Sequence, residues 1–550
     1  MKKMLPLLLV SLLLAGCGPK SQPEISVPKT EPTSPTFPAS QQGNPQYVSP
    51  LGDPTIITLD DNGILVDRLD SGADEDAVIV THDIIYYEDR DTYDSGNPYG
   101  EGEPEERHSA EEAAAHMVVN ITKPGAYLVQ GKLSAGQIRV DLGKDAYEDE
   151  TAVVDLILCN ADITCTVAPA ILFQNVYECD GNWSEEDARP DVDTSAAGAN
   201  LILEGQNIVN GSHVAKIFKD KDGEKKLWKQ DGAIYSYMSM NVEGPGSLEL
   251  NADNEGMDTE LHLTINGGNI HIYSGNDGIN TNEDGVSVTT INDGNLTIFA
   301  GLGKEGDGID SNGYLVINGG TVISCAKPVS DAGLDSDLGS FVHGGTVIAM
   351  GSAMDWAESD SRQVTMNLQF AGQQKAGSKV TVTREDGTEV FSFENNGQYA
   401  REFRGLILSH PAFTQGETYQ VYVDGQQMSY TGTDVARGPG GFGGHPGEMP
   451  ENFDPNTMPE GFQPDRMPGF DSENMPEDFD PSKMKGRGPR PEGMMPPESF
   501  DGQMPEGMEP SEGFDPGQLP GSQQAQAGEP QTGFYMNDNV NAFSGVAAAK

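Results

Sequence analysis

The pattern of apolar and polar positions repeats four times between about residues 263 and 350. Each copy opens with an apolar residue, then Asn or His, then two turn-forming residues, and continues into a β-branched run. The copies begin at Ile265, Ile291, Ile317 and Val342, which are 26, 26 and 25 residues apart. A fixed period in the twenties predicts a repeat fold in which each unit stacks on the next.

The second half of each unit carries a single apolar residue among small and acidic ones: Met257, Ile279, Ile309 and Leu334. Side chains alternate along a strand, so a strand that points this residue inward turns its polar neighbours outward. The Gly pairs suit corners that need a positive φ. Neither a 3.6-residue period nor a leucine-rich pattern is present. The pattern predicts an all-β fold, a right-handed parallel β-helix (a solenoid).

The rest of the chain divides around this β-helix domain, which we place at residues 55–361. Less regular strands precede the repeats, with an acidic insertion over 86–112 and one short helix over 109–116. After the repeats, apolar runs separated by turns predict a small antiparallel cap over 362–436. Asp386-Gly387 is typical of a hairpin turn there.

The N-terminal segment (residues 1–54) and the C-terminal segment (residues 437–550) have few apolar residues outside the first 17 positions. Residues 1–17 combine a basic start, a short apolar stretch and Leu14-Ala-Gly-Cys17, which resembles a bacterial lipobox. This predicts a lipoprotein signal peptide with lipidation of Cys17, an extracytoplasmic location, and membrane contact only through that lipid. The alternative is an ordinary secretory signal with an incidental Cys. Residues 18–54 read as a disordered Pro/Ser/Thr stalk.

Residues 437–550 form an acidic, Met/Pro/Gly-rich segment, which we predict to be a disordered tail. Isolated Phe and Met residues spaced by Pro and acid do not build a core. A passive spacer is the favoured interpretation, and a surface-protein partner for the tail is the alternative.

The net charge of the chain excludes some classes of binding partner. The chain has 86 acidic and 33 basic side chains and a formal net charge of −53. This excludes nucleic acid and anionic membrane surfaces, which need clustered Lys and Arg, and it favours cations. No Cys-x-x-Cys pair supports a zinc site. A Cys165–Cys179 disulfide and buried free thiols both remain open.

Oxygen-bearing side chains recur at the corners of the repeat. Stacked corners would bring carboxylates of neighbouring units together, and Ca²⁺ takes six to eight oxygen ligands. The alternative is that Asp and Asn serve only as turn residues. The predicted calcium-binding residues are Asp258, Glu260, Asp277, Asn280, Asn282, Asp284, Asp307, Asp310, Asn312, Asp331, Asp335 and Asp337.

The order of motifs along the chain resembles a known family. Ile121-Thr-Lys-Pro-Gly-Ala-Tyr127, Gly136-Gln-Ile-Arg-Val-Asp141 and Asp231-Gly-Ala-Ile-Tyr235 precede the Gly-rich repeats. This is similar to the surface carbohydrate-binding β-helix proteins of cellulose-degrading clostridia, over about residues 63–424. The resemblance implies a pectate-lyase-like fold, calcium sites, and binding of cellulose and acidic polysaccharides without established lyase activity. The loops at 89–112, 178–197 and 216–229 depart from it.

Aromatic side chains supply the stacking surface that sugars need. Trp183 and Trp228 lie in polar loops, and Tyr235, Tyr237 and Tyr273 lie on predicted strands. We predict these five as carbohydrate-binding residues. The alternative for the Trp residues is a structural role at the ends of the stack.

No catalytic residue is assigned. A uronate lyase needs a base and a cation, and Lys304 is the only reasonable base in the repeats. The sequence predicts non-catalytic, calcium-dependent binding of polysaccharide at the bacterial cell surface. The alternatives are a calcium-dependent polysaccharide lyase acting on uronates, and an adhesive surface protein without a glycan ligand.

Overall fold

The structure is a computed structural model that describes residues 47–67, 76–87, 104–182, 184–221, 224–303, 305–329, 331–352, 355–397, 400–433 and 529–549. Residues 186, 216–221 and 224–228 are described by their backbone alone. In these ranges no helix has the length and apolar character that a membrane crossing requires. The expected signal peptide, Cys17 and residues 18–46 of the stalk lie outside the described residues, so those interpretations stay predictions. The prediction of a disordered stalk is wrong for its last residues: Ser49 is 8 % exposed and its hydroxyl donates to Asp155 Oδ2, and the Tyr47 N–H donates to Glu204 Oε1 at 2.7 Å.

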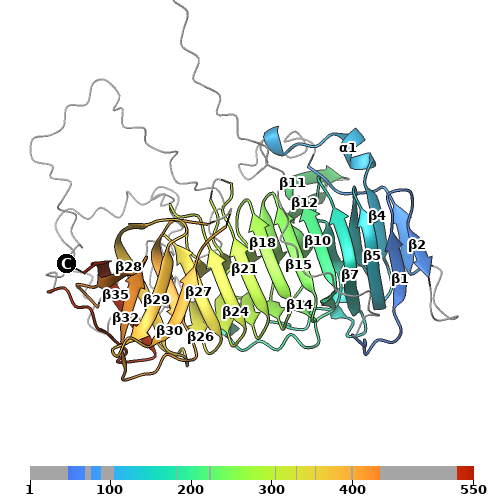
Figure 1. Ribbon diagram of the computed structural model, residues 1–550. Coiled ribbons are helices and arrows are strands. Elements are labelled where there is room, and N and C mark those ends of the chain that lie inside the picture. The colour runs from blue at the N-terminus through green and yellow to red at the C-terminus, as the bar shows by residue number, and fades with distance from the viewer. Residues whose placement is uncertain are drawn as a thin grey trace, which may run out of the picture. The chain divides into compact units, whose positions relative to one another are not determined.

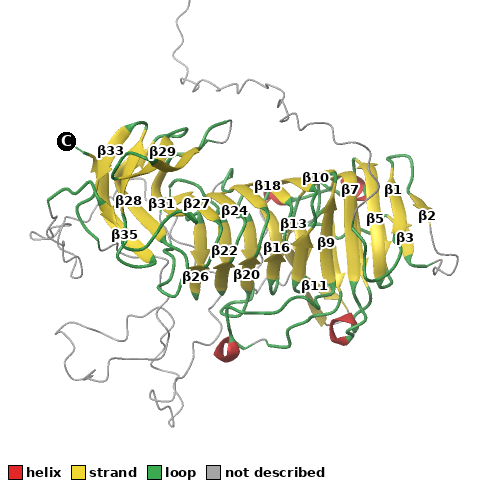
Figure 2. Ribbon diagram, turned by 60° about the horizontal axis from the view of Figure 1, so that its bottom comes forward, coloured by secondary structure: helices red, strands yellow, loops and turns green. Residues whose placement is uncertain are grey.

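Helices are few among the described residues, and strands make up nearly all regular structure (Figure 2). The helical elements are η2 (Pro104–Glu106), α1 (Ala110–Ala114), η3 (Ala146–Glu148) and η4 (Glu185–Asp187). The predicted short helix is confirmed in α1, where the Ser109 side chain accepts a hydrogen bond from the Glu112 N–H as an N-cap.

The strands before the regular repeats are β1 (Thr55–Leu59), β2 (Leu65–Asp67), β3 (Val78–Thr81), β4 (Met117–Ile121), β5 (Gly125–Leu133), β6 (Gly136–Asp141), β7 (Val154–Thr164), β8 (Ile171–Asn175), β9 (Ala199–Glu204), β10 (Gln206–Gly211), β11 (Val214–Lys221), β12 (Glu224–Gln230), β13 (Gly232–Ser236), β14 (Met240–Glu243) and β15 (Ser247–Ala252). The predicted loop at 216–229 is instead an antiparallel hairpin of β11 and β12.

Each regular repeat supplies three strands. They are β16 (Glu255–Thr259), β17 (Leu263–Ile265) and β18 (Asn269–Ser274), then β19 (Ile279–Thr281), β20 (Val288–Ile291) and β21 (Asn295–Phe299), then β22 (Ile309–Ser311), β23 (Tyr314–Ile317) and β24 (Thr321–Cys325), and last β25 (Leu334–Ser336), β26 (Gly339–Val342) and β27 (Thr346–Gly351). The first strand of each triplet joins a nine-stranded sheet, and the other two join a large second sheet.

Equivalent strands of successive repeats pair in parallel and side by side (Figure 1). Ile265 pairs with Ile291, Ile291 with Ile317, and Ile317 with Val342. The 26, 26 and 25-residue spacing is therefore the register of the sheet, as the sequence predicts. A shift by one residue would turn every inward side chain outward, so this register is strongly specified.

The isolated apolar residue of each repeat lies in the core. Met257, Ile279, Ile309 and Leu334 are paired one to the next, and each is 0 % exposed. The Gly before each of them allows a close approach: a Cβ on Gly278 would lie 2.2 Å from Ile298 Cγ2. The corner glycines Gly268 and Gly294 adopt φ of +98° and +100°, which L side chains rarely adopt.

Antiparallel strands follow the repeats: β28 (Thr365–Gln374), β29 (Lys379–Arg384), β30 (Glu389–Glu394), β31 (Phe403–Ser409), β32 (Thr418–Val423), β33 (Gln426–Ser429), β34 (Phe534–Tyr535) and β35 (Val540–Ala548). β29 and β30 form the expected hairpin, with Gly387 at φ +83°. β31 pairs antiparallel with both β27 and β28, so this group continues directly from the last repeat.

The prediction of a disordered tail over 437–550 is wrong for residues 529–549. β34 pairs with β32, and β35 pairs with β28 and β33. Phe534 and Phe543 are buried against Tyr430 at ring-centroid distances of 5.0 and 4.8 Å. Residues 437–528 of the predicted tail lie outside the described residues. The cap predicted over 362–436 therefore takes two further strands from beyond its predicted end.

The loop between β8 and β9 is held on the sheet by buried polar contacts. Glu178 is 6 % exposed and accepts hydrogen bonds from the backbone N–H and the hydroxyl of Ser239, at 2.7 and 2.9 Å. Farther along, the Thr194 hydroxyl donates to Asn241 Oδ1 at 2.8 Å. Because both ends are anchored in this way, the described residues of this loop are part of the folded body.

The buried His262 also contacts the loop between β8 and β9. It is 1 % exposed, its Nδ1 accepts the Val288 N–H at 3.1 Å, and its Nε2 lies 3.5 Å from Asp180 Oδ2 in the loop. Burial lowers the pKa of His262 to about 4, with the Arg189 charge acting in the same direction and Asp180 against it.

We expect the His262 contribution to stability to be lost as the pH falls from about 6.5 to about 4. In this window the unfolded state binds a proton that the folded state rejects, which costs on the order of 3 kcal/mol at the acid end. His262→Asn retains an acceptor for Val288 and removes the titration. Melting temperatures from pH 7 to pH 4 should fall more steeply for the wild type than for the variant. Parallel curves would contradict this assignment.

The four cysteines in the described ranges are free thiols. Cys159, Cys165 and Cys325 are buried, and Cys179 is half-buried. The Cys165–Cys179 disulfide is therefore not formed. Burial raises the pKa of Cys165 and of Cys325 to about 12.

Candidate functional site

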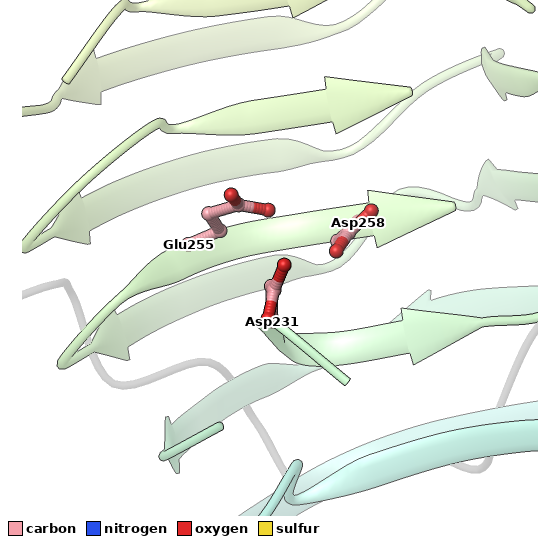
Figure 3. A group of neighbouring side chains, drawn as sticks. All are labelled: Asp231, Glu255 and Asp258. Carbon is pink, nitrogen blue, oxygen red and sulfur yellow. The ribbon is translucent and has the colours of Figure 1, made fainter. Parts of the chain in front are cut away.

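Three carboxylates converge at the corner where β13 and β16 begin (Figure 3). Asp231 immediately precedes β13, and Glu255 and Asp258 lie on β16, the neighbouring parallel strand. Each offers one oxygen, and these oxygens all lie within 4.8 Å of one another. We call Asp231, Glu255 and Asp258 the carboxylate cluster. It is the one group of this kind within the described part of the chain.

Two of the three carboxylates in the cluster are buried, Asp231 is half-buried, and the cluster contains oxygens without a hydrogen-bond donor. Glu255 is 5 % exposed and Asp258 is 0 % exposed. Glu255 Oε2, Asp258 Oδ2 and the nearby Asn280 Oδ1 have no hydrogen-bond partner, and Asn280 Nδ2 donates to the other Glu255 oxygen at 3.4 Å. Buried polar atoms are almost always satisfied, so three unpaired acceptors at one place need an explanation.

Lys229 supplies part of the missing positive charge. Its Nζ lies 2.8 Å from Asp231 Oδ2 and donates to Asn282 Oδ1 at 3.3 Å. The three carboxylates and this ammonium sum to −2 when all are ionised. One divalent cation would bring that sum to zero.

Burial and the crowding of charge raise the pKa values of two carboxylates in the cluster. Burial, then the Asp231 charge, raises the pKa of Glu255 to about 7, with Lys229 acting against the shift. Burial, then the Glu255 charge, holds the pKa of Asp258 well above its usual range. A cation bound between these groups would remove the like-charge repulsion that disfavours their ionised forms.

The predicted calcium-binding residues form rows along the stack. Asp258 pairs with Asn280, Asn280 with Asp310, and Asp310 with Asp335. Two residues farther along the chain from each of these lies a second set: Glu260, Asn282, Asn312 and Asp337. Asn312 Nδ2 donates to Asp284 Oδ1 at 2.9 Å, so Asp284 joins this second set at the same corner.

A third set of predicted residues binds the backbone of neighbouring repeats. Asp277 Oδ1 accepts the Asp307 N–H at 2.6 Å, Asp307 Oδ1 accepts the Ala332 N–H, and Asp331 Oδ2 accepts the Gly306 N–H at 2.9 Å. These carboxylates therefore link neighbouring repeats, which differs from the local turn role that the sequence left open. Burial still raises the pKa of Asp307 to about 8, with Asp335 adding to the shift.

Two members of the carboxylate cluster were missed by sequence reasoning. Glu255 occupies the position of Asp277 and Asp307 in its own repeat, directly before the Gly that precedes the inward residue. Asp231 precedes Gly232 two residues before the inward Ile234, so a similar signal was present. Lys229 lies in the β11–β12 hairpin outside the repeats, and no pattern pointed to it.

Of the predicted aromatic residues whose side chains are described, Tyr235 and Tyr237 contact each other, and Tyr273 stacks on Phe299 instead. Trp183 and the side chain of Trp228 lie outside the described residues, so their roles stay predictions. Tyr235 is fully buried, its hydroxyl donates to Glu260, and its ring has no face open to a ligand. Tyr237 is half-buried and contacts Tyr235 edge to face at 5.0 Å. Tyr273 is half-buried and stacks on Phe299 at 5.6 Å.

The chemistry of the cluster fits Ca²⁺. All its unpaired atoms are oxygens, and they come from carboxylates and an amide, which are ligand types that calcium takes. Sulfur and imidazole ligands, which zinc and copper prefer, are absent from it.

Comparison with known proteins associates this part of the chain with carbohydrate binding. Residues 115–384, which contain the cluster, match a family model described as "Carbohydrate-binding domain-containing protein". A curated protein of the same description from Acetivibrio thermocellus is 32 % identical over 155 residues. That match covers 28 % of this chain and 44 % of the relative, so it spans less than half of the relative's length.

A solved structure is also similar to the chain. It is described as "Structure of the polysaccharide lyase-like protein from C. thermocellum, Gadolinium derivative", and it is 22 % identical. The match covers 53 % of this chain and 93 % of that chain, with a TM-score of 0.30.

Proposed function

We propose that this protein binds polysaccharide without cleaving it, and that binding of acidic glycans depends on calcium. The carrying observation is that the buried carboxylate cluster lies inside the segment that matches the carbohydrate-binding family model. The ligand classes are cellulose and acidic plant-type glycans, as the sequence resemblance implies.

The scaffold for this function is a parallel β-helix. Three strands per repeat, parallel pairing between equivalent strands and an inward row of Met257, Ile279, Ile309 and Leu334 support it. A right-handed sense is the expected one, because parallel crossovers in proteins are nearly always right-handed. Such a stack repeats the same surface groups at regular intervals, which suits a repeating polymer.

Asp231, Glu255 and Asp258 would hold the calcium ion, with Asn280 Oδ1 close by. Bound calcium supplies positive charge where the chain has an excess of carboxylates. The half-buried Asp310 and Asp335 continue the same row, so without calcium the ionised cluster adds to an acidic surface that repels a uronate polymer. The folded chain then fixes the positions of the repeats, and the bound ion reduces the repulsion between this face and an acidic glycan.

The cell surface is the proposed location. The lipobox-like Leu14-Ala-Gly-Cys17 supports lipid attachment at Cys17, followed by a Pro/Ser/Thr stalk. A lipid-anchored binding protein would hold the polymer near the cell that uses it. A surface-protein partner for the acidic segment at 437–528 belongs to the same proposal.

The test is retention of the full chain on insoluble cellulose and on immobilised polygalacturonate, with calcium and then with chelator. We expect retention on polygalacturonate with calcium, and its loss in chelator. The ultraviolet absorbance of an unsaturated product is followed at the same time. Product formation would contradict non-catalytic binding and favour the lyase. Absence of retention on both polymers would leave the adhesive alternative.

A further inference from the structure

A groove of about 600 Å³ lies over the second strands of consecutive repeats. None of the carboxylate-cluster residues lines it. Its floor is a row of outward-facing residues that pair across β14, β17, β20 and β23: Asn241, Thr264, Thr290 and Val316. The groove therefore runs along the stacking direction, across the strands.

One side of the groove is a row of amide side chains. Asn318 Nδ2 donates to Asn292 Oδ1 at 2.9 Å, and Asn292 Nδ2 donates to Asn266 Oδ1 at 2.8 Å. All three are exposed and follow the last residue of their strand, so the row repeats once per strand, about every 4.8 Å. An amide carries two N–H donors and two acceptor lone pairs, so each residue keeps bonding capacity after these contacts.

The other side is the loop 190–195, which is fixed in place. The hydroxyl oxygens of Thr194 and Thr264 are hydrogen-bonded at 2.7 Å, and Asn241 Nδ2 donates to the Thr194 carbonyl at 2.8 Å. These residues are 5 %, 5 % and 7 % exposed. A wall attached to the floor by buried hydrogen bonds exists before any ligand binds, which lowers the entropic cost of binding.

The charges in the groove disfavour an acidic ligand. Asp191 and Asp193 are exposed on the loop wall, and Arg362 is the one cationic Lys or Arg among the lining residues. Burial and the Arg362 charge lower the pKa of His343, which favours its neutral imidazole. The carboxylates can accept hydrogen bonds from hydroxyl groups, and the amides can both accept hydrogen bonds from them and donate hydrogen bonds to them.

We propose that this groove binds a neutral polysaccharide chain that lies along the stack, with its hydroxyl groups on the Asn266, Asn292 and Asn318 row. The polysaccharide class rests on the proposed function, whereas the position and the neutral charge rest on the groove. No residue of the carboxylate cluster lines the groove, so this binding does not require calcium in the site itself. The protein then has a second glycan site beside the calcium-dependent one.

The test compares two double variants of the full chain. Asn292→Ala/Asn318→Ala removes two of the three amides of the row, and Asn269→Ala/Asn295→Ala removes two amides that pair on β18 and β21, outside the groove. Binding to hydroxyethyl cellulose and to polygalacturonate is measured by affinity electrophoresis, with calcium and with chelator. Loss of two hydrogen-bonding groups should weaken hydroxyethyl cellulose binding by about 30-fold, and the control pair should leave it unchanged.

The outcomes separate this proposal from the proposed function. Selective loss in the groove variant, with polygalacturonate binding intact, supports it. Wild-type binding of polygalacturonate but not of hydroxyethyl cellulose overturns the groove and leaves the proposed function standing. Equal binding by the groove variant and the wild type also overturns the groove. Binding of neither polymer refutes both. If both double variants melt at the same temperature as the wild type, a loss of binding is not caused by a loss of folding.

Discussion

Phe543→Ala should lower the free energy of unfolding of the C-terminal cap by about 3–5 kcal/mol, the usual cost of a large buried aromatic. Phe543 on β35 is 2 % exposed. Its ring lies 4.8 Å from that of Tyr430 and 5.0 Å from that of Phe534. The substitution therefore opens a cavity between strands that come from distant parts of the sequence. Differential scanning calorimetry measures the effect.

Tyr535→Ala is the matched control for this prediction. Tyr535 is on the adjoining strand β34, is 51 % exposed, and should change the melting transition by less than about 0.5 kcal/mol. If both variants melt like the wild type, residues 529–549 do not contribute to the cap. In that case the original prediction of a disordered end would stand.

Asp258→Asn should stabilise the protein without calcium and make it less stable than the wild type when calcium is added. Without calcium, the variant removes one of three crowded carboxylates and should be more stable than the wild type at pH 8, because burial and the Glu255 charge hold the pKa of Asp258 well above its usual range. With calcium at about 100 times its dissociation constant, the wild type gains about 2.7 kcal/mol and the variant loses most of this gain. Thermal melts with calcium and with chelator measure both differences.

Asp293→Asn controls for the loss of one negative charge. Asp293 is exposed in a corner and its Oδ1 accepts the Gly294 N–H, away from the cluster. This variant should keep the full calcium response. An equal response to calcium in Asp258→Asn would show that the ion binds elsewhere.

The regular part of the fold could be predicted because it follows from a local rule. A single inward residue such as Ile279 or Ile309, a Gly before it and a positive-φ Gly at the corner are visible in the sequence of each repeat. Strand β35 could not be predicted in this way. It pairs with β28, whose residues are about 175 positions earlier in the chain, and a segment rich in Pro and acid separates them.

The candidate site was only partly predictable for a similar reason. The repeat pattern identified Asp258 and the rows of corner oxygens, because the register brings identical positions together. It could not rank them, since burial and missing hydrogen-bond donors distinguish Asp258 from Asp331. Lys229 and the groove wall at 190–195 come from insertions, whose position depends on tertiary contacts such as that of Thr194 with Asn241.

The most direct test of calcium-dependent glycan binding is a calorimetric titration of polygalacturonate into the full chain. One sample is saturated with calcium and the other is treated with chelator. We predict a binding isotherm in calcium that is absent in chelator, and its loss in the Asp258→Asn variant with calcium present. Equal isotherms in calcium and in chelator would contradict the account, because the carboxylate cluster would then have no part in binding the acidic glycan.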